Sequence, residues 1–206
     1  MSEQVIFYTH PMSRGRIARW MLEETGIKYE TKLLDYGTTM KAPDYLAINP
    51  AGKVPAIKHG DVVVTESAAI CAYLADTFKD SGLAPNTDKE RGAYYRWLFF
   101  TSGPLEQALG FKNLDIQITS DNEKMLGCGN INRTIDILAS TLSQTPYVAG
   151  ERFTAADVYV GSHIGWGLYT GSLDKRPEFV SYYERVINRP AKKRADEIDS
   201  ALLANK

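Results

Sequence analysis

The residues with the clearest chemical potential lie between Asn49 and Phe78, in the stretch NPAGKVPAIKHGDVVVTESAAICAYLADTF. Pro55 interrupts the first apolar run, at a point where a proline removes a hydrogen-bond donor from a sheet. A second run, rich in β-branched residues, ends abruptly at Thr65-Glu66-Ser67, directly before a helical pattern. Both features indicate a backbone that is arranged to contact a ligand.

Other residue types that commonly carry chemistry give weaker patterns. His10, His59 and His163 lie far apart without the spacing of metal ligands, so no metal site is predicted. Cys71 lies among Ala and Ile on a predicted helix, which is typical of a core residue. Cys128 lies between two glycines and has no evident activating partner. The chain has no Gly-rich phosphate loop.

Composition excludes several classes of partner. The chain has 206 residues, with 24 Lys and Arg against 25 Asp and Glu, and this balance argues against a nucleic-acid or acidic-membrane binder. No apolar stretch approaches the roughly 20 residues of a membrane span. The N-terminus shows no signal-peptide pattern, and two cysteines are too few for a disulfide framework. We therefore predict a cytoplasmic protein with free thiols.

The first part of the chain, residues 1–80, predicts an α/β domain. A β-rich run, QVIFYT, precedes the helical pattern RGRIARWMLEETG, for which Ser13 is the predicted N-cap and Gly26 the C-terminal glycine. KYETKLL predicts a second strand, and APDYLAINP predicts a short helix or turn. Two further strands join at His59-Gly60-Asp61, and a helix follows from Ser67. The order β-α-β-α-β-β-α predicts a mixed sheet.

The second part, residues 89–206, predicts only helices and follows a turn-rich linker over residues 81–88. One predicted helix, KERGAYYRWLFFTSGPLEQAL, is interrupted around Gly103-Pro104. A second long helix is predicted over SDNEKMLGCGNINRTIDILASTLSQ, with Ser120 to Glu123 as a capping box. The closing helices are predicted within RPEFVSYYERVINRPAKKRADEI.

The clearest local signal of this part is GERFTAADV. Thr154 and Asp157 have the spacing of a capping box, in which each side chain accepts a hydrogen bond from the backbone N–H of the other residue. Phe153 and Val158 have the spacing of a hydrophobic staple. A helix is therefore predicted to begin directly after Thr154.

Together these motifs resemble those of the cytosolic glutathione S-transferases of bacterial type. The resemblance rests on Ser13 before the first helix, NPAGKVPAI, TESAAICAYL and GERFTAADV, and it covers nearly the whole chain. It implies a thioredoxin-like N-terminal domain joined to an all-helical domain, a homodimer, and glutathione bound in a cleft between the domains.

The resemblance also implies roles for the stretch that opened this section. Val54 offers its backbone to the extended tripeptide, and Pro55 is cis. The γ-glutamyl carboxylate binds the backbone and hydroxyl of Ser67 at a helix start, and Glu66 binds the ammonium group. Lys53 is a candidate partner for the glycyl carboxylate, and Lys41 is a weaker one. The alternatives are a trans proline on an edge strand, a plain helix cap and a solvated lysine.

A glutathione transferase must stabilise the thiolate, because the thiolate is the nucleophile. A free thiol has a pKa near 8.5, and lowering it by two units requires roughly 2.7 kcal/mol. A hydrogen bond to a charged group supplies about 1.5–3 kcal/mol. Ser13, at the helix start, is the favoured donor, and Tyr8, at the end of the first strand, is the rival. His10 and Arg14 are near enough in sequence to polarise the site.

The second substrate is expected to be a small apolar electrophile, since the thiolate brings the polarity. Candidate pocket residues are the aromatics Phe99, Phe100, Phe111, Trp166 and Tyr169, each of which also fits a core position. The predicted reaction is conjugation, in detoxification or stress response. The alternatives on the same fold are a non-catalytic stress or assembly protein and a glutathione-dependent isomerase or peroxidase.

Overall fold

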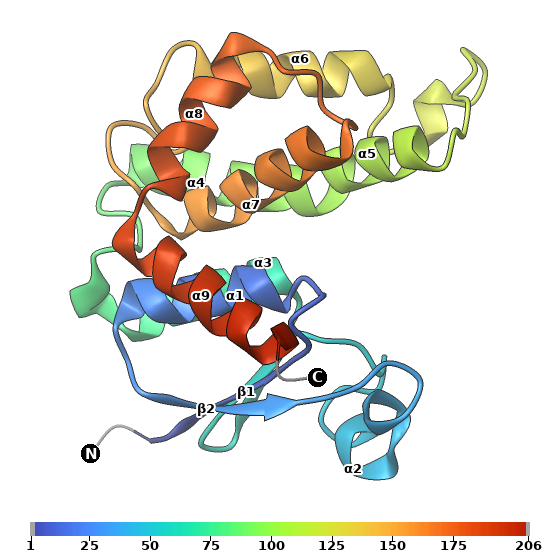
Figure 1. Cartoon of the computed structure of the whole chain (residues 1–206). Helices are drawn as coiled ribbons and strands as arrows, with labels where there is room; N and C mark the ends of the chain where they lie inside the picture. The colour runs from blue at the N-terminus through green and yellow to red at the C-terminus, as the bar shows by residue number, and fades with distance from the viewer. Residues whose placement is uncertain (1–2, 205–206) are drawn as a thin grey trace. The chain divides into compact units, whose positions relative to one another are not determined.

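The computed structural model describes residues 3–204 (Figure 1). It divides into two compact units, one reaching to Ala84 and including the chain from Arg189 onward, the other running from Pro85 to Asn188. The first unit contains the sheet, and the regular elements of the second are helical. This confirms the predicted combination of a thioredoxin-like α/β domain with an all-helical domain.

The sheet is mixed, as the strand pattern predicted. Its strands are β1 (Val5–Thr9), β2 (Tyr29–Leu33), β3 (Ala56–His59) and β4 (Val62–Thr65), in the spatial order β2-β1-β3-β4. β1 is parallel to β2 and antiparallel to β3, and β3 is antiparallel to β4. The hairpin between β3 and β4 turns at Gly60, whose φ of 56° lies in the left-handed region that favours glycine.

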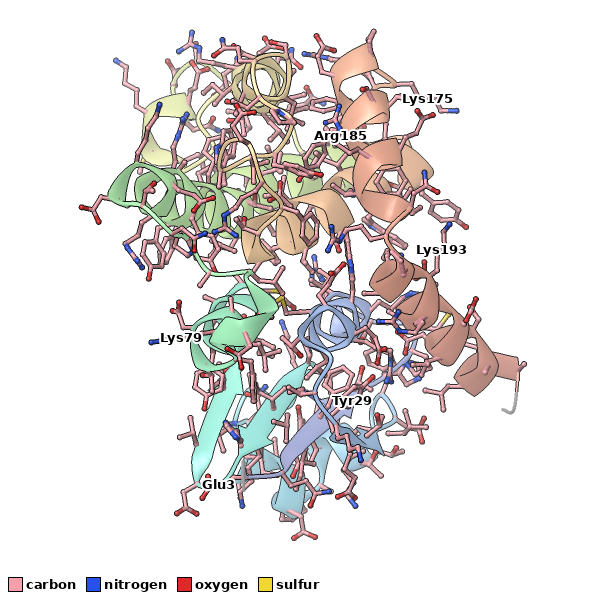
Figure 2. All side chains as sticks on the ribbon, turned by 90° about the vertical axis from the view of Figure 1, so that its left-hand side faces the viewer. Glu3, Tyr29, Lys79, Lys175, Arg185 and Lys193 are labelled. Atoms are coloured by element: carbon pink, nitrogen blue, oxygen red, sulfur yellow. The ribbon has the colours of Figure 1, made fainter. Side chains whose placement is uncertain are left out.

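The helices of the first unit are α1 (Gly15–Thr25), α2 (Pro43–Leu46), α3 (Ser67–Thr77) and α9 (Pro190–Ala204), with single 3₁₀ turns at Thr39–Lys41 and Lys79–Ser81. Helix α1 packs against α3 and α9, and α3 contacts β3 and β4. Helix α1 buries Trp20, Met21 and Leu22, and it ends at Gly26 with φ 69°, as predicted. Figure 2 shows Tyr29 of β2 beside α1, where its hydroxyl donates to Glu23 Oε1 at 2.7 Å.

Helix α9 corrects part of the predicted domain division. The sequence assigned residues 89–206 to the helical domain, but α9 packs against α1 in the first unit. The contact is made by charged side chains: Arg19 Nε donates to Asp199 Oδ1 at 2.7 Å, and both side chains are only 1% exposed. The periodicity of a polar helix does not indicate which core it covers, and this ion pair joins residues 180 positions apart.

The second unit consists of α4 (Asp88–Phe100), a π-helical segment (Thr101–Leu105), α5 (Glu106–Asn113), α6 (Ile131–Leu142), α7 (Ala155–Thr170) and α8 (Pro177–Ile187), with one 3₁₀ turn at Glu123–Met125. The interruption predicted around Gly103-Pro104 is this π-helical segment. Proline has no N–H and clashes with the preceding turn, so the helix widens there and then continues as α5.

The predicted long helix from Ser120 is wrong in its first half. Ser120 and Asp121 lie in a turn, and α6 begins only at Ile131. Asn130 is the N-cap, since its side chain accepts a hydrogen bond from Arg133 N–H at 3.1 Å. Gly129 has a φ of 51°, outside the α-helical region, so the helical pattern on its N-terminal side does not join α6.

The capping box of α7 is confirmed. Thr154 donates its N–H to Asp157 Oδ2 at 2.9 Å, and the Thr154 side chain accepts from the backbone of Asp157. Asp157 Oδ1 accepts from Val148 N–H and from the Tyr182 hydroxyl, each at 2.9 Å. Asp157 is fully buried, and this burial raises its pKa to about 6, although its hydrogen bonds act in the opposite direction.

Candidate active site

The strand register brings the separate candidate segments of the first unit to one end of the sheet. Tyr8 of β1 pairs with Ala56 of β3, which in turn pairs with Thr65 of β4. The chain leaves β1 and β4 at this end and enters β3 there, because β3 is antiparallel to both. Three candidate segments therefore lie beside neighbouring strand ends. They are the turn that carries Ser13, the pair Val54-Pro55, and the pair Glu66-Ser67.

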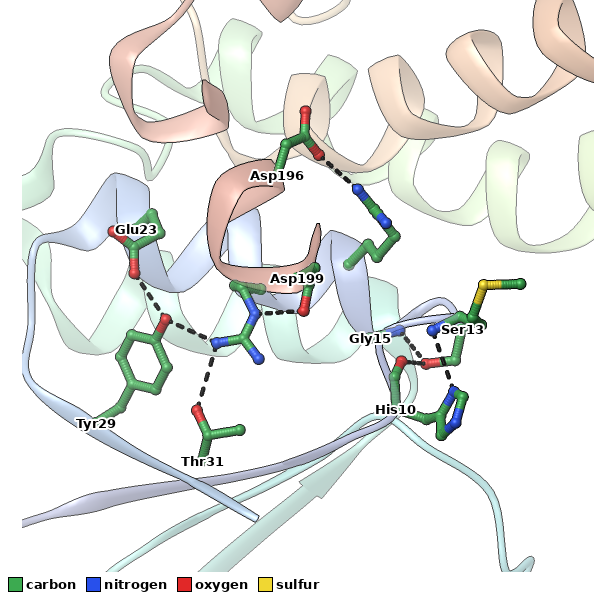
Figure 3. Close-up of polar contacts among 11 residues, drawn as sticks. His10, Ser13, Gly15, Glu23, Tyr29, Thr31, Asp196 and Asp199 are labelled. Atoms are coloured by element: carbon green, nitrogen blue, oxygen red, sulfur yellow. Dashed lines mark hydrogen bonds and ion pairs between the residues drawn. The ribbon is translucent and has the colours of Figure 1, made fainter. Parts of the chain in front are cut away.

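Ser13 lies in the turn between β1 and α1, two residues before the helix (Figure 3). Its hydroxyl accepts the Gly15 N–H at 2.9 Å and donates to the carbonyl oxygen of His10 at 2.6 Å. The formal N-cap is Arg14, so the predicted cap residue is displaced by one position. The hydroxyl still binds a free N–H of the helix start, which is the physical task of a cap.

The turn before Ser13 is held by two aromatic side chains. Met12 donates its N–H to His10 Nδ1 at 3.1 Å, and its carbonyl accepts from the Tyr36 hydroxyl at 3.0 Å. The His10 and Tyr36 rings lie 4.7 Å apart. Tyr36 was not identified from the sequence, since it reaches this turn from 24 residues away.

Gly15 leaves the space that this turn needs. A Cβ at this position would come within 1.9 Å of Thr9 Oγ1 and within 2.9 Å of Ser13 Oγ. Both distances are too short for a real side chain, so any larger residue would displace one of the two hydroxyls. The glycine of the Ser-Arg-Gly sequence is visible in the sequence, but residue spacing alone did not show that this position has no room for a side chain.

Tyr8, the rival of Ser13, is a half-buried strand aromatic. Its ring lies 5.6 Å from that of Tyr45 and packs on a small cluster that includes Met40 and Ala56. This packing is that of a structural aromatic residue at the end of a strand. It gives the Tyr8 ring a fixed place next to the same sheet end.

The segment before β3 is anchored by its neighbours. The Val54-Pro55 peptide bond is cis, as the resemblance implied. Val54 lies two residues before the paired register of β3, so the ladder does not use its backbone groups. The carbonyl of Lys53 accepts hydrogen bonds from the Tyr45 hydroxyl at 2.6 Å and from Asn49 Nδ2 at 2.7 Å. Sequence reasoning missed both of these supporting residues.

The two lysines of this region differ in their surroundings. Lys53 has an exposed side chain. Lys41 donates from Nζ to the carbonyl of Gly52 at 2.8 Å, so it fastens the loop that precedes Lys53. This contact gives Lys41 a structural role and leaves Lys53 as the better candidate for an anion.

Glu66 and Ser67 begin helix α3. Glu66 is exposed and has a φ of 67°, which is uncommon for a residue other than glycine. Ser67 is the first helical residue and is 7% exposed. No side chain caps this helix start, and its first turn carries no acidic residue. The N–H groups of the first turn are therefore suited to an added carboxylate.

The five aromatic candidates of the second unit are spread over three helices. Trp166 and Tyr169 form an exposed pair on α7, with ring centroids 5.7 Å apart and exposures of 62% and 83%. Phe99 on α4 is also exposed, and Phe111 on α5 is half-buried. The Phe100 ring lies 5.2 Å from that of Trp97, and Phe100 lines a cavity of about 470 Å³ next to the π-helical segment.

Neither cysteine is activated. Burial raises the pKa of the Cys71 thiol far above its usual range and also raises that of Cys128. Among residues 3–204, no group of three or more His, Cys, Asp or Glu side chains is placed to hold a metal ion. No helix in the same part of the chain is long and apolar enough to cross a membrane.

Comparison with solved structures gives close agreement over nearly the whole chain. A glutathione transferase from Methylococcus capsulatus is 30% identical, with a TM-score of 0.78 and coverage of 96% of this chain and 99% of that one. A ternary complex of BphK, a bacterial enzyme of this type, is 29% identical, with a TM-score of 0.77 and coverage of 95% and 99%.

Sequence comparison agrees. The glutathione S-transferase N-terminal domain model matches residues 3–76, and the C-terminal domain model matches residues 117–190. The glutathione S-transferase GstA of Escherichia coli O157:H7 is 29% identical over 78% of each chain. Glutathione S-transferase F14 of Arabidopsis thaliana is 29% identical over 84% of this chain and 75% of that protein. The chain belongs to the glutathione S-transferase family.

Proposed function

We propose that this protein conjugates the thiolate of glutathione to small apolar electrophiles and that Ser13 stabilises the thiolate. Family membership supports glutathione transferase activity in general. The observation that carries the proposal is the environment of the Ser13 hydroxyl, which accepts Gly15 N–H at 2.9 Å and donates to a neutral carbonyl at 2.6 Å. This hydroxyl lies at the start of α1 and is only half-buried.

The hydroxyl is suited to bind a thiolate. A hydrogen bond to an ionised acceptor is roughly twice as strong as one between neutral groups, so a thiolate competes well with the His10 carbonyl for the hydroxyl proton. The Gly15 N–H polarises the same oxygen and makes its O–H a better donor. Only rotation about the C–O bond of Ser13 is needed to redirect the proton.

Glutathione binding is proposed to use the two other segments at this end of the sheet. The γ-glutamyl carboxylate binds the first-turn N–H groups of α3 and the Ser67 hydroxyl, and Glu66 binds the ammonium group. Val54 offers its unpaired backbone to the extended peptide, next to Pro55. Lys53 binds the glycyl carboxylate. These groups are supported by their common position and by the absence of a capping side chain at the start of α3.

The chemical step needs no further group on the protein. The bound thiol first loses its proton to solvent, and Ser13 holds the thiolate. The sulfur then attacks the electrophilic carbon, forming an S–C bond while the carbon–halogen bond of an aryl halide breaks and halide leaves. Binding energy spent on positioning the thiolate is realised in the transition state, so it raises turnover.

The apolar substrate is proposed to contact aromatic side chains of the second unit. Phe99, Trp166 and Tyr169 are the exposed candidates. Phe100 and Phe111 are less exposed and stay in the proposal as secondary candidates. We also propose a cytoplasmic homodimer, with detoxification or stress response as its role.

The test compares Ser13→Ala with Tyr8→Phe. We expect Ser13→Ala to abolish the ultraviolet band of bound thiolate at neutral pH and to lower aryl-halide turnover roughly 10- to 100-fold, the equivalent of one charged hydrogen bond. Glutathione affinity should change much less, because the loss belongs to the reactive state. Tyr8→Phe should have a smaller effect.

Other outcomes reassign the role. If Tyr8→Phe abolishes the band while Ser13→Ala keeps it, Tyr8 is the thiolate donor. If both variants keep the band, the backbone N–H groups of the helix start stabilise the sulfur. A wild-type protein that binds glutathione but turns over no aryl halide contradicts the conjugation reaction itself.

A further inference from the structure

We propose that His10 is a positioning residue for Ser13 and that its Nδ1 atom, as a hydrogen-bond acceptor, fixes the turn that aims the Ser13 hydroxyl. The inference rests on the proposed role of Ser13. It concerns a residue that does not itself touch the sulfur, and it gives that residue a specific tautomer and a specific partner.

The His10 residue supplies two acceptors to the turn. Its ring atom Nδ1 accepts from Met12 N–H at 3.1 Å, and its main-chain carbonyl accepts from Ser13 Oγ at 2.6 Å (Figure 3). The intervening Pro11 has no N–H to contribute. Two of the hydrogen bonds that fix the path from the end of β1 to Ser13 are therefore accepted by a single residue.

The geometry determines which ring nitrogen carries the proton. Met12 N–H is a donor, so Nδ1 must present its lone pair, and the hydrogen of a neutral ring lies on Nε2. Nε2 faces Asp35 Oδ1 at 3.9 Å, on the segment after β2. A second proton on Nδ1 would place two N–H groups against each other and break the contact with Met12.

Tyr36 binds the other backbone polar group of Met12, in the peptide that joins Met12 to Ser13. Its hydroxyl donates to the Met12 carbonyl at 3.0 Å, while its ring lies 4.7 Å from that of His10. Met12 itself is 67% exposed, so its side chain contributes little packing to fix the turn. The orientation of the two peptides that flank the Met12 Cα, and of Ser13 directly after them, thus depends on the polar contacts of His10 and Tyr36.

Three variants separate these contributions. His10→Phe keeps an aromatic ring for Tyr36 and removes the acceptor. His10→Asn restores an acceptor, because an asparagine Oδ1 accepts from the N–H two residues ahead in an Asx turn. Tyr36→Phe keeps the ring and removes only the bond to the Met12 carbonyl. Each is compared with the wild type by the pH midpoint of the bound-thiolate band, by kcat and KM for an aryl halide, and by calorimetric titration with glutathione.

We expect His10→Phe to raise the midpoint of thiolate formation by about 0.5–1 pH unit, which corresponds to roughly 3- to 10-fold less thiolate at pH values well below the midpoint. Turnover in that pH range should fall by the same factor, with little change in glutathione affinity. His10→Asn should restore the midpoint to near that of the wild type, and Tyr36→Phe should produce a smaller rise. Thermal unfolding of each variant shows whether the fold is intact, and rescue by asparagine shows that the acceptor is the relevant group.

Two results would overturn the inference. One is a wild-type midpoint in a folded His10→Phe variant. The other is an equal shift in the Phe and Asn variants, since the lost function would then not be the acceptor. These two results are distinct from a failure of the proposed function. That failure would appear as a thiolate band retained in Ser13→Ala, independently of the results for the His10 variants.

Discussion

At the scale of single residues, the start of α3 gives a direct test of the glutathione cradle. Ser67 is buried at an uncapped helix start, and the neighbouring Glu66 is exposed. We expect Ser67→Ala to weaken glutathione binding by an order of magnitude or more, because hydrogen bonds to charged groups are worth about 1.5–3 kcal/mol. Glu66→Gln should have a similar effect, because it removes the negative charge while keeping the shape of the side chain. Calorimetric titration measures both affinities.

Lys58→Met provides a control for this pair, since it changes a charge on the neighbouring strand β3 outside the proposed cradle. Unchanged affinity in both Ser67→Ala and Glu66→Gln would remove the cradle from this helix start. A lowered melting temperature together with lower affinity would show that the Ser67 hydroxyl stabilises the fold and affects glutathione binding only indirectly.

The sequence identified the residues that form motifs but not the residues that hold them. Ser13, the Val54-Pro55 pair and the Glu66-Ser67 pair follow from local patterns and from the family resemblance. Tyr36 and Tyr45 act through hydrogen bonds to backbone carbonyls in other segments, at Met12 and Lys53. A tyrosine that binds a carbonyl leaves no periodic or compositional signal. Its role becomes visible only when the fold brings the two segments together.

At the scale of elements, the capping box of α7 predicts a pH-dependent stability. Burial raises the pKa of Asp157 to about 6 from a usual value of 3.8. The folded protein therefore binds this proton more tightly than the unfolded chain does. The stabilisation from this group is fully present below about pH 4 and is lost as the pH rises through 6. A shift of about two units corresponds to about 3 kcal/mol.

Asp157→Asn tests this expectation. At pH 7 the variant should be less stable by about 0.5–2 kcal/mol, because it loses part of the cap. The deficit relative to the wild type should grow as the pH falls toward 4, since only the wild type gains from protonation there. Urea unfolding at several pH values measures both curves. Parallel curves would show that Asp157 keeps an ordinary pKa, and unchanged stability would contradict its role as a cap.

Helix boundaries were predictable where a cap was present and uncertain where glycines lay within a helical pattern. Thr154 and Asp157 specify the start of α7 by complementary hydrogen bonds between near neighbours in sequence. The start of α6 was missed because Asn130 competes with Ser120 as a cap. The Gly-Cys-Gly segment between them makes Asn130 the cap, because Gly129 takes a positive φ and so interrupts the helical backbone before α6.

At the scale of the whole molecule, the two-part organisation and the mixed sheet followed from the order of the elements. The attachment of α9 did not. Its contact with α1 depends on the buried ion pair of Arg19 and Asp199, and Arg189, directly before α9, adds a pair in which its Nε lies 2.6 Å from Glu24 Oε1. Charged residues on a helix usually indicate a solvated face. Only the partner helix shows that these charges are paired.

Assembly gives the last prediction. Helix α4 buries Tyr94 and Trp97, but it leaves Tyr95 at 38% and Phe99 at 71% exposure one turn apart. Exposed aromatic side chains on one helix face are typical of an interface core, and twofold dimers are the commonest assemblies. We expect a dimer across the micromolar range in sedimentation, with Tyr95→Glu shifted toward monomer because it places a charge at the interface. Met125→Glu, at a position that is 86% exposed on another segment, is the matched control and should remain dimeric. A monomeric wild type would contradict the homodimer, and a dimeric Tyr95→Glu would place the interface away from this face of α4.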